Sequence, residues 1–380
     1  MKILTVIGAR PQIIKAAAIS RAISNHFNKT VNEIILHTGQ HYDENMSDVF
    51  FKEMGVPQPA YNLNIGSGMH GKQTAQMISG IEEIIVKEKP SCIVIYGDTN
   101  STLAGALAGS KLHIPVVHIE AGMRSFNKQM PEEINRVLAD HVSTLLFTST
   151  KTGWQNLMKE GFKSDNTPPW SVSNPNVFLC GDIMFDNSLY FADLAVKKES
   201  FLKKNRLEPR KYILVTIHRD FNTDDPIRLN NLFSAFDEIS SSENIVFAIP
   251  LHPRTKKLLP VNLMPGLFKK VSRCENIRFL PPASYLEMIA LEKNSRMIMT
   301  DSGGVQKEAF FFKKPCITLR PETEWVELVE NGNNIIADDD IEKIAGAFRY
   351  FSGGPVITYP PFYGNGKTAE FIIEEVIKNL

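Results

Sequence analysis

Short runs of apolar and β-branched residues alternate with segments of helical length along the whole chain, and this alternation most constrains the fold. The predicted strands lie at residues 3–7, 33–37, 92–96, 116–119, 145–147, 177–179, 213–217, 245–249, 277–280, 297–300, 316–319 and 334–337. Most of these runs are continuously apolar, as strands buried on both faces of a sheet are. Segments of helical length lie between them, for example at residues 71–88, 101–112, 132–143 and 228–239. Strands that alternate with helices in this way predict parallel α/β sheets.

A polar interruption near the middle of the chain predicts two domains, which 380 residues suffice to form. Residues 164–176 are polar and contain three prolines, which is typical of a surface loop. We expect a helix over residues 182–198 and a boundary between the two strand–helix halves around residues 180–210. Because open α/β sheets bind ligands outside the carboxyl ends of their strands, a ligand is expected between the two halves.

The composition argues against nucleic acid and membranes as partners. Lys plus Arg and Asp plus Glu both total 42, so the formal net charge is zero. No apolar run approaches the ~20 residues that a membrane span needs. The first apolar run ends at Gly8, which makes it too short for the core of a signal peptide. The cysteines are scattered without CxxC spacing, which favours a reducing, cytoplasmic compartment.

The segment after the first predicted strand is a candidate anion site. Gly8 permits a tight turn, and Pro11 suits the first turn of a helix. Arg10 and Lys15 then lie near a helix N-terminus, which favours phosphate binding. Two solvated cations are the alternative interpretation.

Carboxylates follow the third and fourth predicted strands. Asp98 lies in YGDTNST and Glu120 in HIEAGMRS, while Glu132 and Glu133 open the helix that begins with PEEINR. Asp98 can serve as a helix cap, and acidic residues in a first turn interact favourably with the helix dipole. Carboxylates from separate loops at one sheet edge alternatively indicate acid/base catalysis.

The second half carries the strongest binding signal of the chain. Residues 301–308, DSGGVQKE, follow a predicted strand and open a helix. A serine and two glycines at a helix N-terminus leave backbone N–H groups available to a phosphate. Glu308 lies one turn further along and can reach a ribose diol. Two histidines also follow strands of this half, His218 in IHRD and His252 in HPR.

Residues 66–73, GSGMHGKQ, match GxGxxG and nearly match a Walker loop, but their surroundings disagree. Gln73 stands where Ser or Thr would hold magnesium, and no strong apolar strand precedes the segment. We therefore expect a flexible glycine loop and neither NTPase activity nor dinucleotide binding. No histidine has HExxH or comparable ligand spacing, so neither a metal nor another cofactor is expected.

Taken together, the motifs resemble those of a known enzyme family. The non-hydrolysing UDP-N-acetylglucosamine 2-epimerases contain, in the same order, motifs similar to GARPQ, TGQHYD, YGDTNST, HIEAGMRS, PEEINR, IHR, LHPR and DSGGVQKEA. The resemblance covers essentially the whole chain. It implies an α/β fold of the glycosyltransferase-B type, with two Rossmann-like, doubly wound parallel-sheet domains that face a cleft. Residues 1–180 would carry the catalytic carboxylates, residues 181–363 would bind UDP, and a helix within residues 364–380 would complete the first domain.

The resemblance also implies roles for individual residues. The catalytic residues would be Asp98, Glu120, Glu132 and His218. The residues that bind the UDP-sugar would be Arg10, Lys15, Arg136, His252, Ser302, Gly303, Gly304 and Glu308. The enzyme would interconvert UDP-N-acetylglucosamine and UDP-N-acetylmannosamine by anti elimination of UDP and re-addition through a 2-acetamidoglucal. It would need no cofactor, form a homodimer and supply precursors of surface polysaccharides.

Departures from the common N-acetylglucosamine members favour a second substrate. The chain has GARPQ where those members have GTRPE, and Trp325 replaces an arginine in the TERPE motif. These differences resemble the branch that acts on UDP-2,3-diacetamido-2,3-dideoxyglucuronic acid. Some members bind a second, activating substrate molecule, but QHYD at residues 40–43 differs from their site and argues against such activation.

Two further classes stay open. A glycosyltransferase of the same fold would use the same nucleotide-binding turn but would need an acceptor. A catalytically silent UDP-sugar-binding regulator would keep that turn and Glu308, but the presence of all the carboxylates argues against it.

Overall fold

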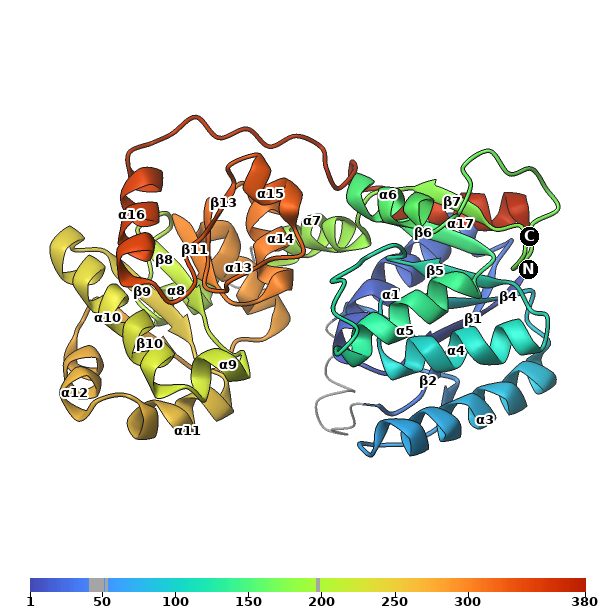
Figure 1. Ribbon diagram of the computed structural model, residues 1–380, viewed down its shortest axis with the longest axis horizontal. Coiled ribbons are helices and arrows are strands. Elements are labelled where there is room, and N and C mark those ends of the chain that lie inside the picture. Colours follow the sequence, from blue (N-terminus) through green and yellow to red (C-terminus); the bar gives the residue numbers. More distant parts are fainter. Residues whose placement is uncertain (41–50, 52–53, 196–198) are drawn as a thin grey trace. The chain divides into compact units, whose positions relative to one another are not determined.

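The structure is a computed structural model, and it describes residues 1–40, 51, 54–195 and 199–380 (Figure 1). The chain divides into two compact units, unit 1 comprising Met1–Asn187 with Pro361–Leu380 and unit 2 comprising Ser188–Pro360. The boundaries predicted from sequence, at residues 180 and 363, lie a few residues away from these. One continuous helix, α7 (Ile183–Ala195), begins in unit 1 and ends in unit 2, so no loop marks the first division, whereas the second, at Pro360–Pro361, lies in a segment without helix or strand.

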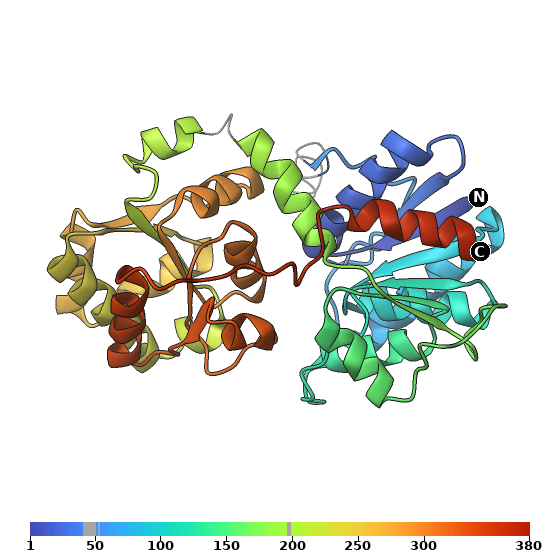
Figure 2. The ribbon, with the colours of Figure 1, turned by 90° about the horizontal axis from the view of Figure 1, so that it is seen from above.

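Unit 1 is built on a parallel sheet with helices on both faces (Figure 1; Figure 2). Within its described residues the sheet has seven strands in the order β3-β2-β1-β4-β5-β6-β7. The strands are β1 (Lys2–Ile7), β2 (Asn32–His37), β3 (Tyr61–Asn62), β4 (Cys92–Tyr96), β5 (Val116–Ile119), β6 (Leu145–Thr148) and β7 (Asn176–Leu179). The helices are α1 (Arg10–Ala22), the π-helical η1 (Ile23–Phe27), α3 (His70–Glu88), α4 (Asn100–Lys111), α5 (Pro131–His141), α6 (Lys151–Lys159) and α17 (Thr368–Asn379).

Unit 2 repeats this architecture with a sheet of six parallel strands among its described residues, in the order β10-β9-β8-β11-β12-β13. The strands are β8 (Tyr212–Thr216), β9 (Val246–Pro250), β10 (Ile277–Leu280), β11 (Met297–Thr300), β12 (Cys316–Thr318) and β13 (Asn334–Ile336). The helices are α8 (Glu199–Lys204), α9 (Asp220–Thr223), α10 (Pro226–Glu243), α11 (Pro253–Asn262), α12 (Pro265–Arg273), α13 (Tyr285–Asn294), α14 (Gly303–Phe311), α15 (Val326–Glu330) and α16 (Ile341–Ser352).

Each sheet has one point at which the strand order reverses. In unit 1, β1 pairs in parallel with β2 on one side and with β4 on the other. In unit 2, β8 pairs in the same way with β9 and β11. Loops diverge in opposite directions at such a point and leave room for a ligand at the carboxyl ends of the strands. The turns after β1, β4, β8 and β11 are therefore where each unit is expected to hold its functional groups.

The structure confirms the predicted alternation of strands and helices. Every predicted strand forms, with ends that differ by one residue at most, because most are continuous apolar runs buried in a sheet. Among the described residues, the sequence did not predict one strand, β3, a two-residue Tyr-Asn segment that pairs there only with the end of β2. The predicted C-terminal helix is α17, which packs against α1 (Figure 2). None of the helices in the described residues is long and apolar enough to cross a membrane.

Candidate active site

In unit 1, one buried side chain joins the turns that follow β1 and β4. The Gln12 Oε1 atom accepts hydrogen bonds from the backbone N–H groups of Gly8, at 2.9 Å, and Ala9, at 3.1 Å. Its Nε2 atom donates to the Tyr96 carbonyl, at 3.0 Å. A Cβ atom on Gly8 would lie 2.1 Å from the hydroxyl of Ser101, so only glycine fits there. The side chain of Gln12 therefore fixes the two turns at the switch point together.

Glu120 lies directly after β5 and forms an ion pair with Lys15 of α1. Both side chains are largely buried, with exposed fractions of 14% and 12%. Gly97 lies against this pair, because a Cβ atom on it would be 3.1 Å from Lys15 Nζ and 3.2 Å from Glu120 Oε2. The φ angle of Glu120 is +70°, which is uncommon for a residue with a side chain and costs about 1 kcal/mol or more. Such strain is maintained only where the surrounding structure holds the backbone.

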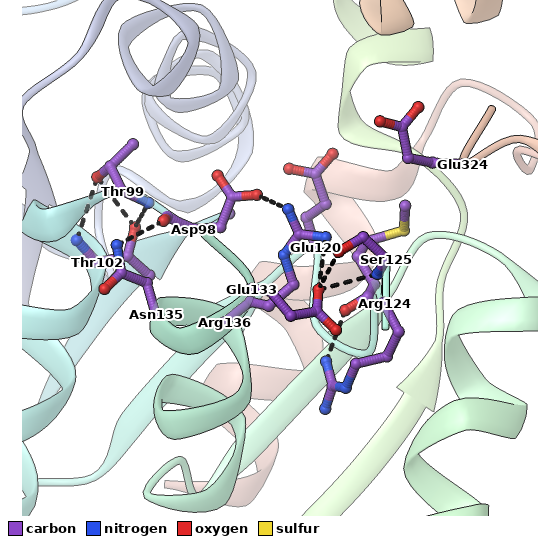
Figure 3. Close-up of polar contacts among 12 residues, drawn as sticks. Asp98, Thr99, Thr102, Glu120, Arg124, Ser125, Glu133, Asn135, Arg136 and Glu324 are labelled. Atoms are coloured by element: carbon purple, nitrogen blue, oxygen red, sulfur yellow. Dashed lines mark hydrogen bonds and ion pairs between the residues drawn. The ribbon is translucent and has the colours of Figure 1, made fainter. Parts of the chain in front are cut away.

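Asp98 lies after β4 and forms an ion pair with Arg136 of α5 (Figure 3). Asn135 supports the same turn, because its Nδ2 atom donates to the Asp98 carbonyl at 3.0 Å. Burial raises the pKa of the Asp98 carboxyl, and the nearby Glu120 adds to this, although Arg136 and Lys15 oppose it. The cap interpretation of Asp98 is wrong, because the N-cap of α4 is Thr99.

The structure thus brings together four of the predicted residues in unit 1. Two carboxylates, those of Asp98 and Glu120, are interleaved with two cations, those of Lys15 and Arg136. Carboxylates held in this way at a switch point are suited to proton transfer. Arg10 begins α1 at the same edge of the sheet, and its side chain is exposed.

The two glutamates that open α5 have different environments. Glu132 is exposed to solvent. Glu133 is buried, and its carboxylate accepts hydrogen bonds from the Ser125 N–H and hydroxyl and from the Phe126 N–H, at 2.9–3.0 Å (Figure 3). The Glu133 Oε2 atom also lies 3.3 Å from the Arg136 Nη1 atom, within ion-pair distance. The residue pattern alone did not distinguish the two glutamates, since both occupy the first helical turn, and only the family resemblance singled out Glu132. In the structure Glu133 orders the preceding loop, and Glu132 is accessible.

The segment at residues 66–73 lies next to the Asp98 turn. It connects β3 to α3 and contains the first turn of that helix. Gln73 donates to the Gly66 carbonyl at 2.6 Å and accepts from Asn100 at 2.7 Å. Asn100 in turn accepts a hydrogen bond from Asn135, at 3.1 Å. The strand that precedes this segment, β3, is only two residues long and not apolar, as expected from the sequence, and hydrogen bonds connect the segment to the candidate site.

Of the QHYD segment at residues 40–43, only Gln40 lies among the described residues. Its Oε1 atom accepts hydrogen bonds from the Ser101 backbone N–H, at 3.0 Å, and hydroxyl, at 2.7 Å. The positions named in the expectation about a second substrate molecule, His41, Tyr42 and Asp43, lie outside the described residues.

In unit 2, the predicted phosphate-binding turn opens α14 directly after β11. Ser302 is the N-cap of this helix, and Gly303 and Gly304 form its first turn. The indole Nε1 atom of Trp325 donates to the Gly303 carbonyl at 2.8 Å, and Lys307 packs its ammonium over the same ring at 4.2 Å from the centroid. These contacts fix the turn while its N–H groups remain at the helix N-terminus, an arrangement suited to binding a phosphate.

The turn after β8 is held by the buried carboxylate of Asp301. This carboxylate accepts from the backbone N–H groups of His218 and Arg219, at 3.0 Å each. The His218 Nδ1 atom lies 3.3 Å from Asp301 Oδ1, and the His218 side chain is partly exposed. Partial burial, together with the charges of Arg219 and His252, lowers the pKa of His218, although Asp301 opposes the change. His252 is exposed and caps α11, accepting from the Arg254 N–H at 3.3 Å.

Glu308 lies one turn into α14 and is buried. A second buried carboxyl group, Glu292 of α13, interacts with it, and burial and the charge of Glu308 raise the pKa of Glu292 well above its usual range. Within the ranges that the structure covers, no group of three or more His, Cys, Asp or Glu side chains is arranged to hold a metal ion.

Two parallel α/β units, each with its polar groups at a switch point, define a two-domain enzyme of the glycosyltransferase-B fold class. A family profile described as UDP-N-acetylglucosamine 2-epimerase matches residues 24–377. The chain therefore belongs to the UDP-N-acetylglucosamine 2-epimerase family, whose members are isomerases that act on sugar nucleotides.

Individual relatives agree with this assignment. A UDP-N-acetylglucosamine 2-epimerase homolog of Methanococcus maripaludis is 49% identical, and the match covers 100% of both chains. A UDP-2,3-diacetamido-2,3-dideoxy-D-glucuronate 2-epimerase of Pseudomonas aeruginosa is 46% identical, again over 100% of both. The crystal structure of Methanocaldococcus jannaschii UDP-GlcNAc 2-epimerase in complex with UDP-GlcNAc and UDP matches with a TM-score of 0.84, at 41% identity and 100% coverage of both chains.

Proposed function

We propose that this protein is a UDP-N-acetylglucosamine 2-epimerase that interconverts UDP-N-acetylglucosamine and UDP-N-acetylmannosamine. The observation that carries the proposal is the cluster at the switch point of unit 1, where Asp98 and Glu120 are held beside Arg136 and Lys15. Two of the relatives named above, the Methanococcus maripaludis homolog and the Methanocaldococcus jannaschii enzyme, whose crystal structure is in complex with UDP-GlcNAc and UDP, support the choice of substrate.

The chemistry of the sugar determines the type of reaction. The proton on C2 of a 2-acetamido sugar is not acidic, so direct removal and return of this proton is a poor route. In an elimination, a base removes the C2 proton while the bond from C1 to the UDP oxygen breaks, and a C1–C2 double bond forms. UDP then adds back to C1 of the 2-acetamidoglucal, and a proton is delivered to the opposite face of C2.

The residues of unit 1 supply the proton transfers in this proposal. Asp98, Glu120 and Glu132 act as the general acids and bases, each worth about 10²–10⁴-fold in rate. The raised pKa of Asp98 brings this carboxyl closer to the pH of the reaction, which favours reversible proton transfer. Lys15 is engaged with Glu120, so we assign to it the orientation of that carboxylate as well as contact with the substrate.

The residues of unit 2 hold the nucleotide. Ser302, Gly303 and Gly304 bind the diphosphate through the N-terminus of α14, and Glu308 binds the ribose hydroxyls. His218 stabilises the departing diphosphate together with Arg10 of unit 1. Further contacts to the substrate come from His252 and Arg136. No cofactor takes part in these steps.

The test is incubation of the protein with UDP-N-acetylglucosamine and no acceptor, followed by NMR. We expect a mixture of the two C2 epimers. A glycosyltransferase would give no product or slow release of the free sugar, and that result would overturn the proposal.

A second candidate substrate is UDP-2,3-diacetamido-2,3-dideoxyglucuronic acid. The observation in its favour is the 46% identity to the Pseudomonas aeruginosa enzyme named for that substrate. Parallel assays of both sugar nucleotides decide the question. A kcat/KM at least ten times higher for the uronate would replace the N-acetylglucosamine assignment, whereas the reverse ratio would support it.

We further propose that the enzyme is a cytoplasmic homodimer that supplies precursors of surface polysaccharides. The four free cysteines, which fit a reducing compartment, support the location. Light scattering coupled to size-exclusion chromatography tests the dimer, and a mass close to the monomer's 42.7 kDa would refute it.

A further inference from the structure

A chain of buried charges lies beneath the candidate catalytic loops of unit 1. His118 of β5 and Asp140 of α5 have fully buried side chains, and the His118 Nδ1 atom lies 2.7 Å from Asp140 Oδ1. Arg124 lies 2.7 Å from Asp140 Oδ2 and is held at its other edge by both carboxylate oxygens of Glu160, at 2.7 and 2.6 Å. Acidic and basic side chains thus alternate from the partly exposed Glu160 inward to His118.

Both ring nitrogens of His118 face acceptors. The Nε2 atom lies 2.8 Å from the Gly97 carbonyl, which can only accept a hydrogen bond. The Nδ1 atom faces a carboxylate, and His118 and Arg124 lower the pKa of Asp140 despite the opposing effect of its burial. The His118 ring therefore bridges a backbone carbonyl on one side and a carboxylate on the other.

Two hydrogen bonds connect this network to the loops that carry the candidate catalytic carboxylates. Gly97, whose carbonyl accepts from His118, directly precedes Asp98. The Gly122 N–H donates to Asp140 Oδ2 at 3.1 Å, and Gly122 lies two residues after Glu120. The His118–Asp140 pair thus holds the backbone of both loops by hydrogen bonds.

The strained backbone of Glu120 needs such support. Its φ of +70° persists only if neighbouring groups hold the peptide on each side. The Phe147 carbonyl accepts from the N–H groups of Glu120 and Ala121, at 3.0 Å each, and Asp140 holds the next N–H, that of Gly122. Loss of the Asp140 contact would let this turn relax and move the Glu120 carboxylate away from Lys15.

We propose that His118, with Asp140, is a positioning residue that sets the backbone of the Asp98 and Glu120 loops for proton transfer. This proposal rests on the proposed function for its kinetic consequences but not for its structural ones. His118 contacts no substrate in it and acts only through Gly97 and Asp140. Catalysis depends steeply on the placement of acid and base groups, so a small displacement of both carboxylates lowers kcat more than it weakens substrate binding.

The test compares His118→Phe with a matched control, His37→Phe. His37 is also a buried histidine at the end of a strand of the same sheet, but its Nδ1 atom accepts a hydrogen bond from the Gly39 N–H, at 3.0 Å. For His118→Phe we expect kcat to fall by about 10- to 100-fold, with KM and the Kd for UDP within threefold of wild type. For His37→Phe we expect kcat, KM and the Kd for UDP all to lie within threefold of wild type. An unchanged kcat in His118→Phe, or a parallel loss of UDP affinity, would overturn the proposal.

A second variant and a measurement without substrate test the proposal if His118→Phe does not fold or the epimerase assignment fails. If His118→Phe does not fold, Asp140→Asn replaces it, because an amide offers one acceptor oxygen where the carboxylate uses two. We expect at least a fivefold loss of kcat there, and wild-type kcat would overturn the proposal. Hydrogen exchange needs no substrate: faster exchange at residues 97–99 and 120–123 in the variant than in His37→Phe supports the proposal even if the epimerase assignment fails. Unchanged exchange at both segments overturns it.

Discussion

Units 1 and 2 share one architecture, but they fill their switch points with different chemistry. Unit 1 gathers ionisable side chains, with Asp98 and Glu120 paired to cations from α1 and α5. Unit 2 instead presents the N-terminus of α14, and its buried Asp301 is used to hold the backbone of the neighbouring turn. In the proposed function, one fold supplies proton-transferring groups in one unit and backbone donors in the other. If this division is correct, substitutions in unit 1 change mainly kcat and substitutions in unit 2 change mainly affinity.

The largest effect is expected from the carboxylates of unit 1. Asp98→Asn, Glu120→Gln and Glu132→Gln keep the side-chain shape but remove the proton-transferring group. We expect kcat to fall by about 10²-fold or more with modest changes in KM, measured by steady-state epimerisation. Near-normal kcat in all three variants would mean that the site has been assigned to the wrong residues.

The next largest effect is expected in unit 2, for Glu308→Ala. Loss of a charge-assisted hydrogen bond to the ribose should weaken UDP binding by about 1–3 kcal/mol, or roughly 5- to 150-fold in Kd. Isothermal titration calorimetry with UDP measures this, with Glu132→Gln as the control, because unit 1 carboxylates should not affect UDP affinity in the same way. Equal affinities for Glu308→Ala and wild type would remove Glu308 from the nucleotide site.

The two glutamates of α5 allow catalysis and stability to be separated. Glu133→Gln should lower the free energy of unfolding by about 1–3 kcal/mol, since the buried carboxylate accepts three hydrogen bonds from the preceding loop. Glu132→Gln, at an exposed position, should change it by less than about 0.5 kcal/mol. Urea unfolding of both variants tests this contrast, and a greater loss for Glu132→Gln would contradict it.

A smaller effect, of a few fold, should appear in the pH dependence of the two units. Asp98 acts as a base when ionised, and its pKa is raised, so kcat should fall as the pH is lowered through a value above 3.8. His218 has a pKa below 6.5, so UDP-GlcNAc affinity should rise as the pH falls through that lower value and the imidazolium forms. His218→Asn should abolish the second change without moving the first. Identical affinity profiles for His218→Asn and wild type would exclude this role for His218.

The sequence predicted the strands and the loops that carry the site because both depend on local patterns. Buried parallel strands appear as continuous apolar runs, and Asp98 and Glu120 lie within two residues of the ends of two of them. The sequence did not predict β3, because a two-residue edge strand contains no continuous apolar run. The pairing of Lys15 with Glu120 joins positions 105 residues apart and follows from tertiary packing alone.

The sequence also did not predict the buried network of His118, Asp140 and Arg124 in unit 1, and helix α5 shows why. This helix exposes two apolar residues, Ile134 and Leu138, and buries its polar residues Arg136 and Asp140. Hydrophobic periodicity therefore assigns its faces the wrong way round.

The central claim is that carboxylates of unit 1 exchange the C2 proton of a bound UDP-sugar with solvent. Turnover of UDP-N-acetylglucosamine in D₂O, analysed by NMR and mass spectrometry, measures this directly. We expect deuterium at C2 of the recovered sugar nucleotide in wild type and at least 10²-fold slower incorporation in Asp98→Asn. Epimerised product whose C2 carries no deuterium would contradict the claim.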